Sequence, residues 1–179
     1  HAIIRKLKES PRCGKLYCTP GNGGIARDAQ CFDVPATDVA GVVELATRLM
    51  VDLVFVAPDD PLVAGMVDAL EEAGISAFGP RANAAILEGS KVFSKDLMKK
   101  YNIPTAAYGV FHKVDEAKEF IAQTGAPIVV KADGLAAGKG VVVAMTVEEA
   151  NAAVEDMLSG NRFGEAGSTV VIEEFMDGE

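Results

Sequence analysis

Residues 131–140 read Lys-Ala-Asp-Gly-Leu-Ala-Ala-Gly-Lys-Gly and lie between two apolar runs, 127–130 and 141–144. Glycines and small alanines let backbone amides approach an anion closely, and the two lysines add positive charge. The flanking runs predict two strands joined only by this loop. We therefore interpret the loop as a flap that folds over phosphates. An ordinary hairpin turn is the alternative, although such a turn needs only about two to five residues.

The same stretch differs from a P-loop. Only three residues separate Gly134 from Gly138, and glycine rather than serine or threonine follows Lys139. A P-loop also leads into a helix, whereas the run 140–144 predicts a strand. The loop is therefore expected to belong to another class of phosphate-binding fold.

The sequence around the flap predicts a small α+β unit over residues 104–179. Thr146 and Glu149 have the spacing of a capping box, which indicates a helix start, and apolar residues from Ala150 to Leu158 continue its buried face. Strands are expected near 106–111, 127–131, 140–144 and 169–175, and a further helix near 115–124. The strands on either side of the flap should be antiparallel.

Residues 1–103 show strand–helix alternation, which is typical of a parallel, doubly wound α/β sheet. The run 52–57 is continuously apolar and predicts a strand buried on both faces. The other expected strands are 16–19 and 76–78, and the expected helices are 39–50, 61–73 and 89–102. The chain starts in a helical pattern at His1 and stops on a strand, so we expect a fragment truncated at both ends.

Composition narrows the possible functions. A net charge of −9 argues against a nucleic-acid partner, which needs a basic surface. No apolar run approaches the roughly 20 residues of a membrane span, and the first residues lack a signal-peptide core. The three cysteines are odd in number and lack C-x-x-C spacing, which favours reduced thiols in the cytoplasm. His1 and His112 are the only histidines, so no metal site is expected within the chain.

Several motifs, in order along the chain, resemble those of the phosphoribosylamine–glycine ligase family of the ATP-grasp superfamily. Besides the flap, they are Pro20-Gly-Asn-Gly-Gly24, Pro61-Leu-Val63, Phe78-Gly-Pro80, Leu87-Glu-Gly-Ser-Lys91, Ile103-Pro-Thr105 and Ile172-Glu-Glu-Phe175. The resemblance implies a pre-ATP-grasp substrate domain over 1–103 and the first part of an ATP-grasp domain over 104–179.

The resemblance also implies a nucleotide site. Lys91 and Lys131 would contact the α- and β-phosphates of ATP, although each could instead be an ordinary exposed lysine. The flap would cover the triphosphate through Asp133, Gly134, Gly138, Lys139 and Gly140. Glu173 and Met176 would meet the adenine edge, mostly through backbone, and Glu179 would lie near the ribose. The Mg²⁺ ligands are expected outside this chain.

In the resembling family, ATP drives the joining of glycine to 5-phosphoribosylamine through a glycyl phosphate. Gly21, Asn22 and Gly23 would help to hold the phosphoribosylamine, and so would Asp59. The family usually shows Gly-Pro-Glu-Ala-Pro where this chain has Ala57-Pro-Asp-Asp-Pro61, so the chain departs from the pattern there. No catalytic side chain is assigned.

Three alternatives remain open on sequence grounds. The first is another ATP-grasp carboxylate–amine ligase or carboxylase, which would share the flap but not the substrate turn. The second is a nucleotide-binding module without catalysis. The third is a structural α/β protein without a ligand, which the two flap lysines disfavour.

Overall fold

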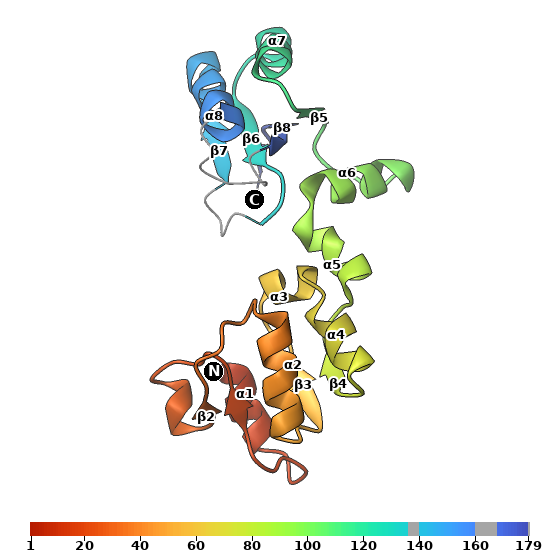
Figure 1. The fold of residues 1–179 in the computed structure, drawn as a ribbon. Helices are drawn as coiled ribbons and strands as arrows, with labels where there is room; N and C mark the ends of the chain where they lie inside the picture. Colours follow the sequence, from red (N-terminus) through yellow and green to blue (C-terminus); the bar gives the residue numbers. More distant parts are fainter. Residues whose placement is uncertain (136–139, 160–167, 179) are drawn as a thin grey trace. The chain divides into compact units, whose positions relative to one another are not determined.

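The computed structural model of the chain describes residues 1–135, 140–159 and 168–178. These residues form two compact units, His1–Ala85 and Ile86–Glu179 (Figure 1). Each unit has its own hydrophobic core. The sequence places the boundary near residue 103 instead. The two boundaries differ in where they place segment 86–103. In the structure this segment belongs to the second unit, because its Lys95 is buried and pairs with Glu173 of that unit.

The first unit contains two parallel strand pairs. Strand β1 (Tyr17–Cys18) pairs with β2 (Gln30–Cys31), and β3 (Leu53–Phe55) pairs with β4 (Ser76–Phe78). The helical elements are α1 (Ala2–Lys8), the 3₁₀ turn η1 (Ile25–Arg27), α2 (Val39–Arg48), α3 (Asp59–Val63), α4 (Met66–Glu72) and the start of α5 (Ala82–Gly89). The expected parallel pairing is confirmed, as two separate two-stranded sheets among the described residues.

Helix α2 shows how this unit's core forms. Asp38 precedes the helix, and its carboxylate accepts the backbone N–H of Gly41 at 3.0 Å. Such a cap satisfies an amide that has no partner within the helix. Val42, Leu45 and Ala46 lie at helical spacing and are buried. The helix therefore turns one apolar face inward, where Val42 and Ala46 join the core that contains α4.

Two expectations for this unit are wrong. The predicted helix 61–73 is two helices, α3 and α4, because Gly65 between them has φ +85°, a left-handed conformation that cannot continue a right-handed helix. Strand β3 is not buried on both faces, since Leu53 is 54% exposed. Its only described ladder partner is β4, and on the exposed side Phe55 stacks on Phe78 with ring centroids 4.7 Å apart.

The second unit is built on a four-stranded antiparallel sheet in the order β5-β8-β6-β7. The strands are β5 (Tyr108–Phe111), β6 (Ile128–Ala132), β7 (Val141–Ala144) and β8 (Val170–Glu174), and the helices after α5 are α6 (Lys91–Lys100), α7 (Val114–Thr124) and α8 (Val147–Ser159). The α+β arrangement and the antiparallel pair on either side of the flap are both confirmed.

The sheet of the second unit has two different faces, because side chains alternate along a strand. One face packs against α7 and α8, which lie side by side (Figure 1), and contains fully buried residues such as Val130 and Ile172. The other face carries Lys131, Glu173 and the partly exposed Val141 and Val143. The polar residues of interest thus lie on the face that helices α7 and α8 leave open.

The helix starts of this unit differ in detail from expectation. The predicted helix 89–102 begins only at Lys91, after the Ser90 cap, and α5 precedes it. The Thr146 hydroxyl accepts the N–H of Glu149 at 3.2 Å, as a capping box requires. The Glu149 carboxylate, however, accepts from the N–H of Met145, one residue before the expected donor.

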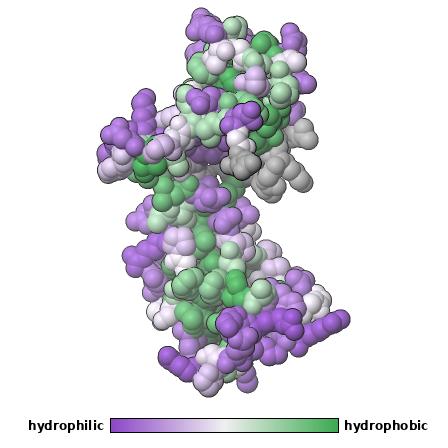
Figure 2. Space-filling view, turned by 180° about the vertical axis from the view of Figure 1, so that it is seen from behind, coloured by the Kyte–Doolittle hydropathy of each residue, from purple (hydrophilic) through white to green (hydrophobic). Residues whose placement is uncertain are grey.

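Among the described residues, no helix is long and apolar enough to cross a membrane. Hydrophilic side chains lie scattered between hydrophobic ones over the visible surface of each unit (Figure 2). The three cysteines are free thiols, as expected, and each is partly buried.

Candidate functional site

Three charged side chains meet on the open face of the second unit's sheet. The Glu173 carboxylate lies between two ammonium groups, with Oε1 3.0 Å from Lys131 Nζ and Oε2 2.9 Å from Lys95 Nζ. Strand β8 supplies the glutamate, β6 supplies Lys131 and α6 supplies Lys95. We call these three residues the charged triad. Two cations and one anion leave it with one net positive charge.

Two members of the triad are well shielded from water. Lys95 and Glu173 are the two charged residues classed as buried in the described part of the chain. Lys95 Nζ also donates to Thr105 Oγ1 at 2.8 Å and to the carbonyl of Ala106 at 3.3 Å. Burial of a charge is costly unless it is paired and hydrogen-bonded. These contacts meet that requirement and fix the carboxylate in place.

Lys131 differs from its two partners in exposure. Its side chain is 27% exposed, whereas those of Lys95 and Glu173 are 10% and 8% exposed. Of the two ammonium groups in the triad, that of Lys131 is therefore the one that a ligand can reach. An anion that approached the open face of the sheet would meet this lysine.

A second polar arrangement ties the flap to helix α6. The Asp133 carboxylate accepts the backbone N–H of Lys91 at 2.6 Å and that of Val92 at 3.2 Å, and Ser90 Oγ donates to it. Lys91 Nζ donates to the carbonyl of Gly134 at 2.8 Å. A carboxylate at a helix N-terminus satisfies free amides and interacts favourably with the helix dipole.

The two ends of the flap are close together. The N–H of Ala132 donates to the carbonyl of Gly140 at 2.8 Å, and that of Asp133 donates to the carbonyl of Thr169 at 2.9 Å. The predicted flap residues Gly138 and Lys139 lie outside the described residues, and so does Glu179.

Five of the ten predicted nucleotide residues fall into these two arrangements. Lys131 and Glu173 belong to the triad, while Lys91, Asp133 and Gly134 take part in the contacts that tie the flap to α6. Met176 lies beyond the end of β8 and is 65% exposed.

Sequence reasoning missed Lys95. Its spacing of four residues from Lys91 on a predicted helix could have suggested it, because such residues share a helix face.

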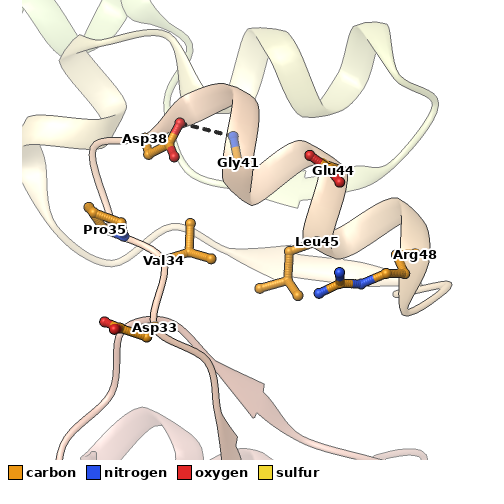
Figure 3. Close-up of a pocket in the computed structure, with 8 residues that line it drawn as sticks. All are labelled: Asp33, Val34, Pro35, Asp38, Gly41, Glu44, Leu45 and Arg48. Carbon is orange, nitrogen blue, oxygen red and sulfur yellow. Dashed lines mark hydrogen bonds between the residues drawn. The ribbon is translucent and has the colours of Figure 1, made fainter.

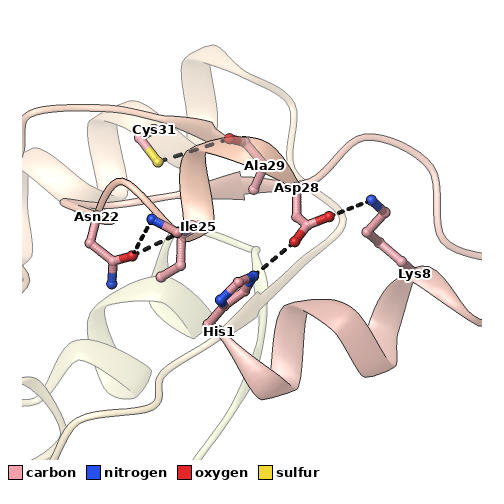
Figure 4. Close-up of polar contacts among 8 residues, drawn as sticks. His1, Lys8, Asn22, Ile25, Asp28, Ala29 and Cys31 are labelled. Atoms are coloured by element: carbon pink, nitrogen blue, oxygen red, sulfur yellow. Dashed lines mark hydrogen bonds and ion pairs between the residues drawn. The ribbon is translucent and has the colours of Figure 1, made fainter.

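The predicted substrate turn lies in the first unit. Asn22 Oδ1 accepts the N–H groups of Gly24 and Ile25, both at 3.0 Å, and so closes the turn on itself (Figure 4). Gly21 has φ +78°, which favours glycine. Gly23 is exposed, and so is Asp59, the first residue of α3.

Asp28 lies next to this turn, just after η1. Its carboxylate contacts Lys8 Nζ at 2.7 Å and His1 Nε2 at 2.8 Å (Figure 4). The hydrogen bond from Lys8 lowers the pKa of Asp28 below its usual value. The carboxylate is therefore ionised over the neutral range.

A separate pocket of the first unit contains none of the predicted site residues. It is lined by Asp33, Val34, Pro35, Asp38, Gly41, Glu44, Leu45 and Arg48 (Figure 3). Asp38 already caps α2. Among the described residues, no group of three or more histidine, cysteine or acidic side chains is arranged to hold a metal ion.

Family models match the chain over its whole length. The model of the phosphoribosylglycinamide synthetase N domain matches residues 1–88, and that of the ATP-grasp (A) domain of the same synthetase matches residues 89–179. The chain belongs to the phosphoribosylglycinamide synthetase family. The two matched regions meet at residues 88 and 89, close to the division between the two units.

Individual relatives agree with this family assignment. The chain is 54% identical over 181 residues to a phosphoribosylamine–glycine ligase of Xylella fastidiosa, with 100% of this chain and 42% of the relative covered. It is similar in structure to the phosphoribosylamine–glycine ligase of Thermotoga maritima, with a TM-score of 0.77 and 29% identity over 98% of this chain and 41% of that one. The chain thus spans about two fifths of the length of these family members.

A more distant likeness supports the fold alone. The biotin carboxylase domain of the Hydrogenobacter thermophilus 2-oxoglutarate carboxylase superposes with a TM-score of 0.78 at 22% identity, over 98% of this chain and 42% of that one. That domain was solved with MgADP, ADP and bicarbonate. The architecture of this synthetase-family chain is therefore shared with that biotin carboxylase domain.

Proposed function

We propose that the full-length protein containing this chain joins glycine to 5-phosphoribosylamine in the cytoplasm, with ATP as the energy source, to give glycinamide ribonucleotide, ADP and phosphate. The observation that carries this proposal is the consecutive match of both domain models of one synthetase family. The 54% identity to a phosphoribosylamine–glycine ligase supports the same substrates.

The second unit is suited to hold the nucleotide. The whole chain carries a net charge of −9, so an anionic substrate needs a local positive region. The charged triad supplies one, with Lys131 accessible on the open sheet face. We assign the ATP phosphates to Lys131, to Lys91 and to the flap, and the adenine to the end of β8 near Glu173 and Met176.

The proposed reaction has two steps. A carboxylate oxygen of glycine attacks the γ-phosphorus of ATP, and ADP leaves. The amine of phosphoribosylamine then attacks the glycyl carbonyl, phosphate leaves and the amine loses a proton. Both steps require stabilised phosphoryl charge and exclusion of water from the acyl phosphate. Lys131 and the backbone amides of the flap would serve these needs in this chain.

Magnesium would offset phosphate charge in this reaction. We place its ligands elsewhere in the full-length protein. We assign the phosphoribosylamine to the turn formed by Gly21, Asn22 and Gly23, with Asp59 as a further contact. The closed hydrogen bonding at Asn22 supports a rigid turn that is ready to receive a ligand.

The decisive experiment measures ADP release by the full-length protein with MgATP, glycine and freshly generated phosphoribosylamine, omitting each substrate in turn. ADP release that requires both substrates would support the proposal. ADP release with a different carboxylate or amine would keep the ATP-grasp ligase and overturn the purine substrates. Nucleotide binding without any turnover would favour a binding module.

A further inference from the structure

We propose that Lys95 is a positioning residue that offsets the charge of Glu173, so that Lys131 is available to the nucleotide phosphates. This inference rests on the proposed function, since it concerns the same site. Lys95 itself touches no ligand in the proposal: its side chain is 10% exposed and its ammonium group is surrounded by protein atoms.

The geometry gives the two lysines different roles. Glu173 presents one carboxylate oxygen to each lysine, at 3.0 Å and 2.9 Å. Lys95 has two further acceptors, Thr105 Oγ1 and the carbonyl of Ala106, and its Nζ lies 5.6 Å from the ring centre of Tyr108. Lys95 is therefore fixed. Lys131 has Glu173 as its one ion-pair partner among the described residues and is more exposed.

Charge balance shows why the fixed lysine matters. Without Lys95, the buried carboxylate would depend on Lys131 alone, and the pair would have no net charge to offer a phosphate. With Lys95 present, the carboxylate keeps a partner when Lys131 turns to a ligand. A buried ion that loses its partner is strongly unfavourable. Lys95 therefore lowers the cost of releasing Lys131.

Four versions of the triad test this idea by their net charge. The unmodified protein has one positive charge, Lys95→Met has none, Glu173→Gln has two, and the double variant Lys95→Met/Glu173→Gln again has one. We expect the affinity for MgADP to rise with the net positive charge of the triad. Lys95→Met should bind about tenfold more weakly, the effect of a lost charge-assisted contact. The adenine contact assigned to residue 173 is made mostly through backbone, which glutamine retains. Glu173→Gln should therefore bind at least as tightly as the unmodified protein, and the double variant within about threefold of it.

The measurement is titration calorimetry of the full-length protein with MgADP, which binds without turnover. Lys118→Met serves as the matched control, because Lys118 pairs with Glu155 in the same unit but outside the triad. Its affinity should not change. Thermal unfolding of each variant shows whether it is folded. If Lys95→Met does not fold, the double variant decides, since it leaves no unpaired buried charge.

Several results would overturn the inference. Unchanged affinity in Lys95→Met would do so, and so would weaker binding in both Lys95→Met and Glu173→Gln, because a purely structural triad predicts loss in either case. A folded double variant that binds about tenfold more weakly would also contradict it. If the unmodified protein does not bind MgADP, both the proposed function and this inference fail. If it binds MgADP and Lys95→Met binds equally well, this inference alone fails.

Discussion

The carboxylate of Asp133 lies 2.6 Å from the backbone nitrogen of Lys91, across 42 residues of sequence. This contact joins the start of the flap to the first turn of α6. It also holds Lys91 so that its ammonium group reaches the carbonyl of Gly134. Asp133, which the sequence predicts to lie at the triphosphate, thus has its carboxylate occupied by the helix amides. Substitution of Asp133 tests how much this contact stabilises the unit.

We expect Asp133→Ala to lower the free energy of unfolding of the second unit by about 1–2 kcal/mol, because two helix amides and the Ser90 hydroxyl lose their acceptor. Urea unfolding of the full-length protein, followed by a probe in this unit, measures the change. Asp133→Asn is the control, since its side-chain oxygen can still accept from the N–H of Lys91. Equal stability of the alanine variant and the unmodified protein would show that the cap is not stabilising.

We expect Lys131→Ala to weaken ATP binding by roughly 1–3 kcal/mol, the contribution of a charge-assisted contact to a phosphate. Competition of ATP against a fluorescent nucleotide on the full-length protein gives the affinity. Lys113→Ala is a suitable control, because Lys113 is exposed and forms its ion pair with Glu116, three residues along the chain. If the two variants bind ATP equally well, the assignment of Lys131 to the phosphates is wrong.

Local sequence signals predicted much of the second unit. The runs around the flap gave an antiparallel pair because both runs are β-branched and only the flap separates them. The helix start at Thr146 followed from side chains within one turn of each other. Such features depend on near neighbours in sequence, so pattern reasoning can find them.

Features that depend on distant residues were missed. Lys95 looks like an ordinary lysine on a polar helix until Glu173 is placed beside it, 78 residues later in the sequence. The start of α6 is fixed partly by Asp133, another distant partner. The break at Gly65 was missed for a different reason, because a single glycine is tolerated within helices at a cost of about 1 kcal/mol.

Cys18 provides a test of the first unit's local environment. Burial raises the pKa of its thiol, and the neighbouring Cys31 raises it further. The thiolate is the reactive form, so a raised pKa means less thiolate and slower alkylation. We expect Cys18 to react with iodoacetamide more slowly than free cysteine at mildly alkaline pH, as followed by mass spectrometry. Cys31→Ser should speed the alkylation of Cys18. If Cys18 of the unmodified protein reacts as fast as free cysteine or faster, the expected rise in its pKa is contradicted.

Two glycines of the proposed substrate turn should respond differently to alanine. A Cβ added at Gly21 would lie 2.4 Å from Cys31 Sγ, and the φ of +78° disfavours any side chain there. At Gly23, an added Cβ meets nothing within 4 Å. We expect Gly21→Ala to lower the free energy of unfolding of the first unit by about 1–3 kcal/mol, and Gly23→Ala to change it by less than about 0.5 kcal/mol.

Thermal unfolding of both variants measures this change in stability. The KM of the full-length protein for phosphoribosylamine adds a second measurement, which tests the proposed substrate contact. A raised KM in the stable Gly23→Ala variant would place the substrate against the turn, whereas an unchanged KM in both variants would remove the turn from the substrate site.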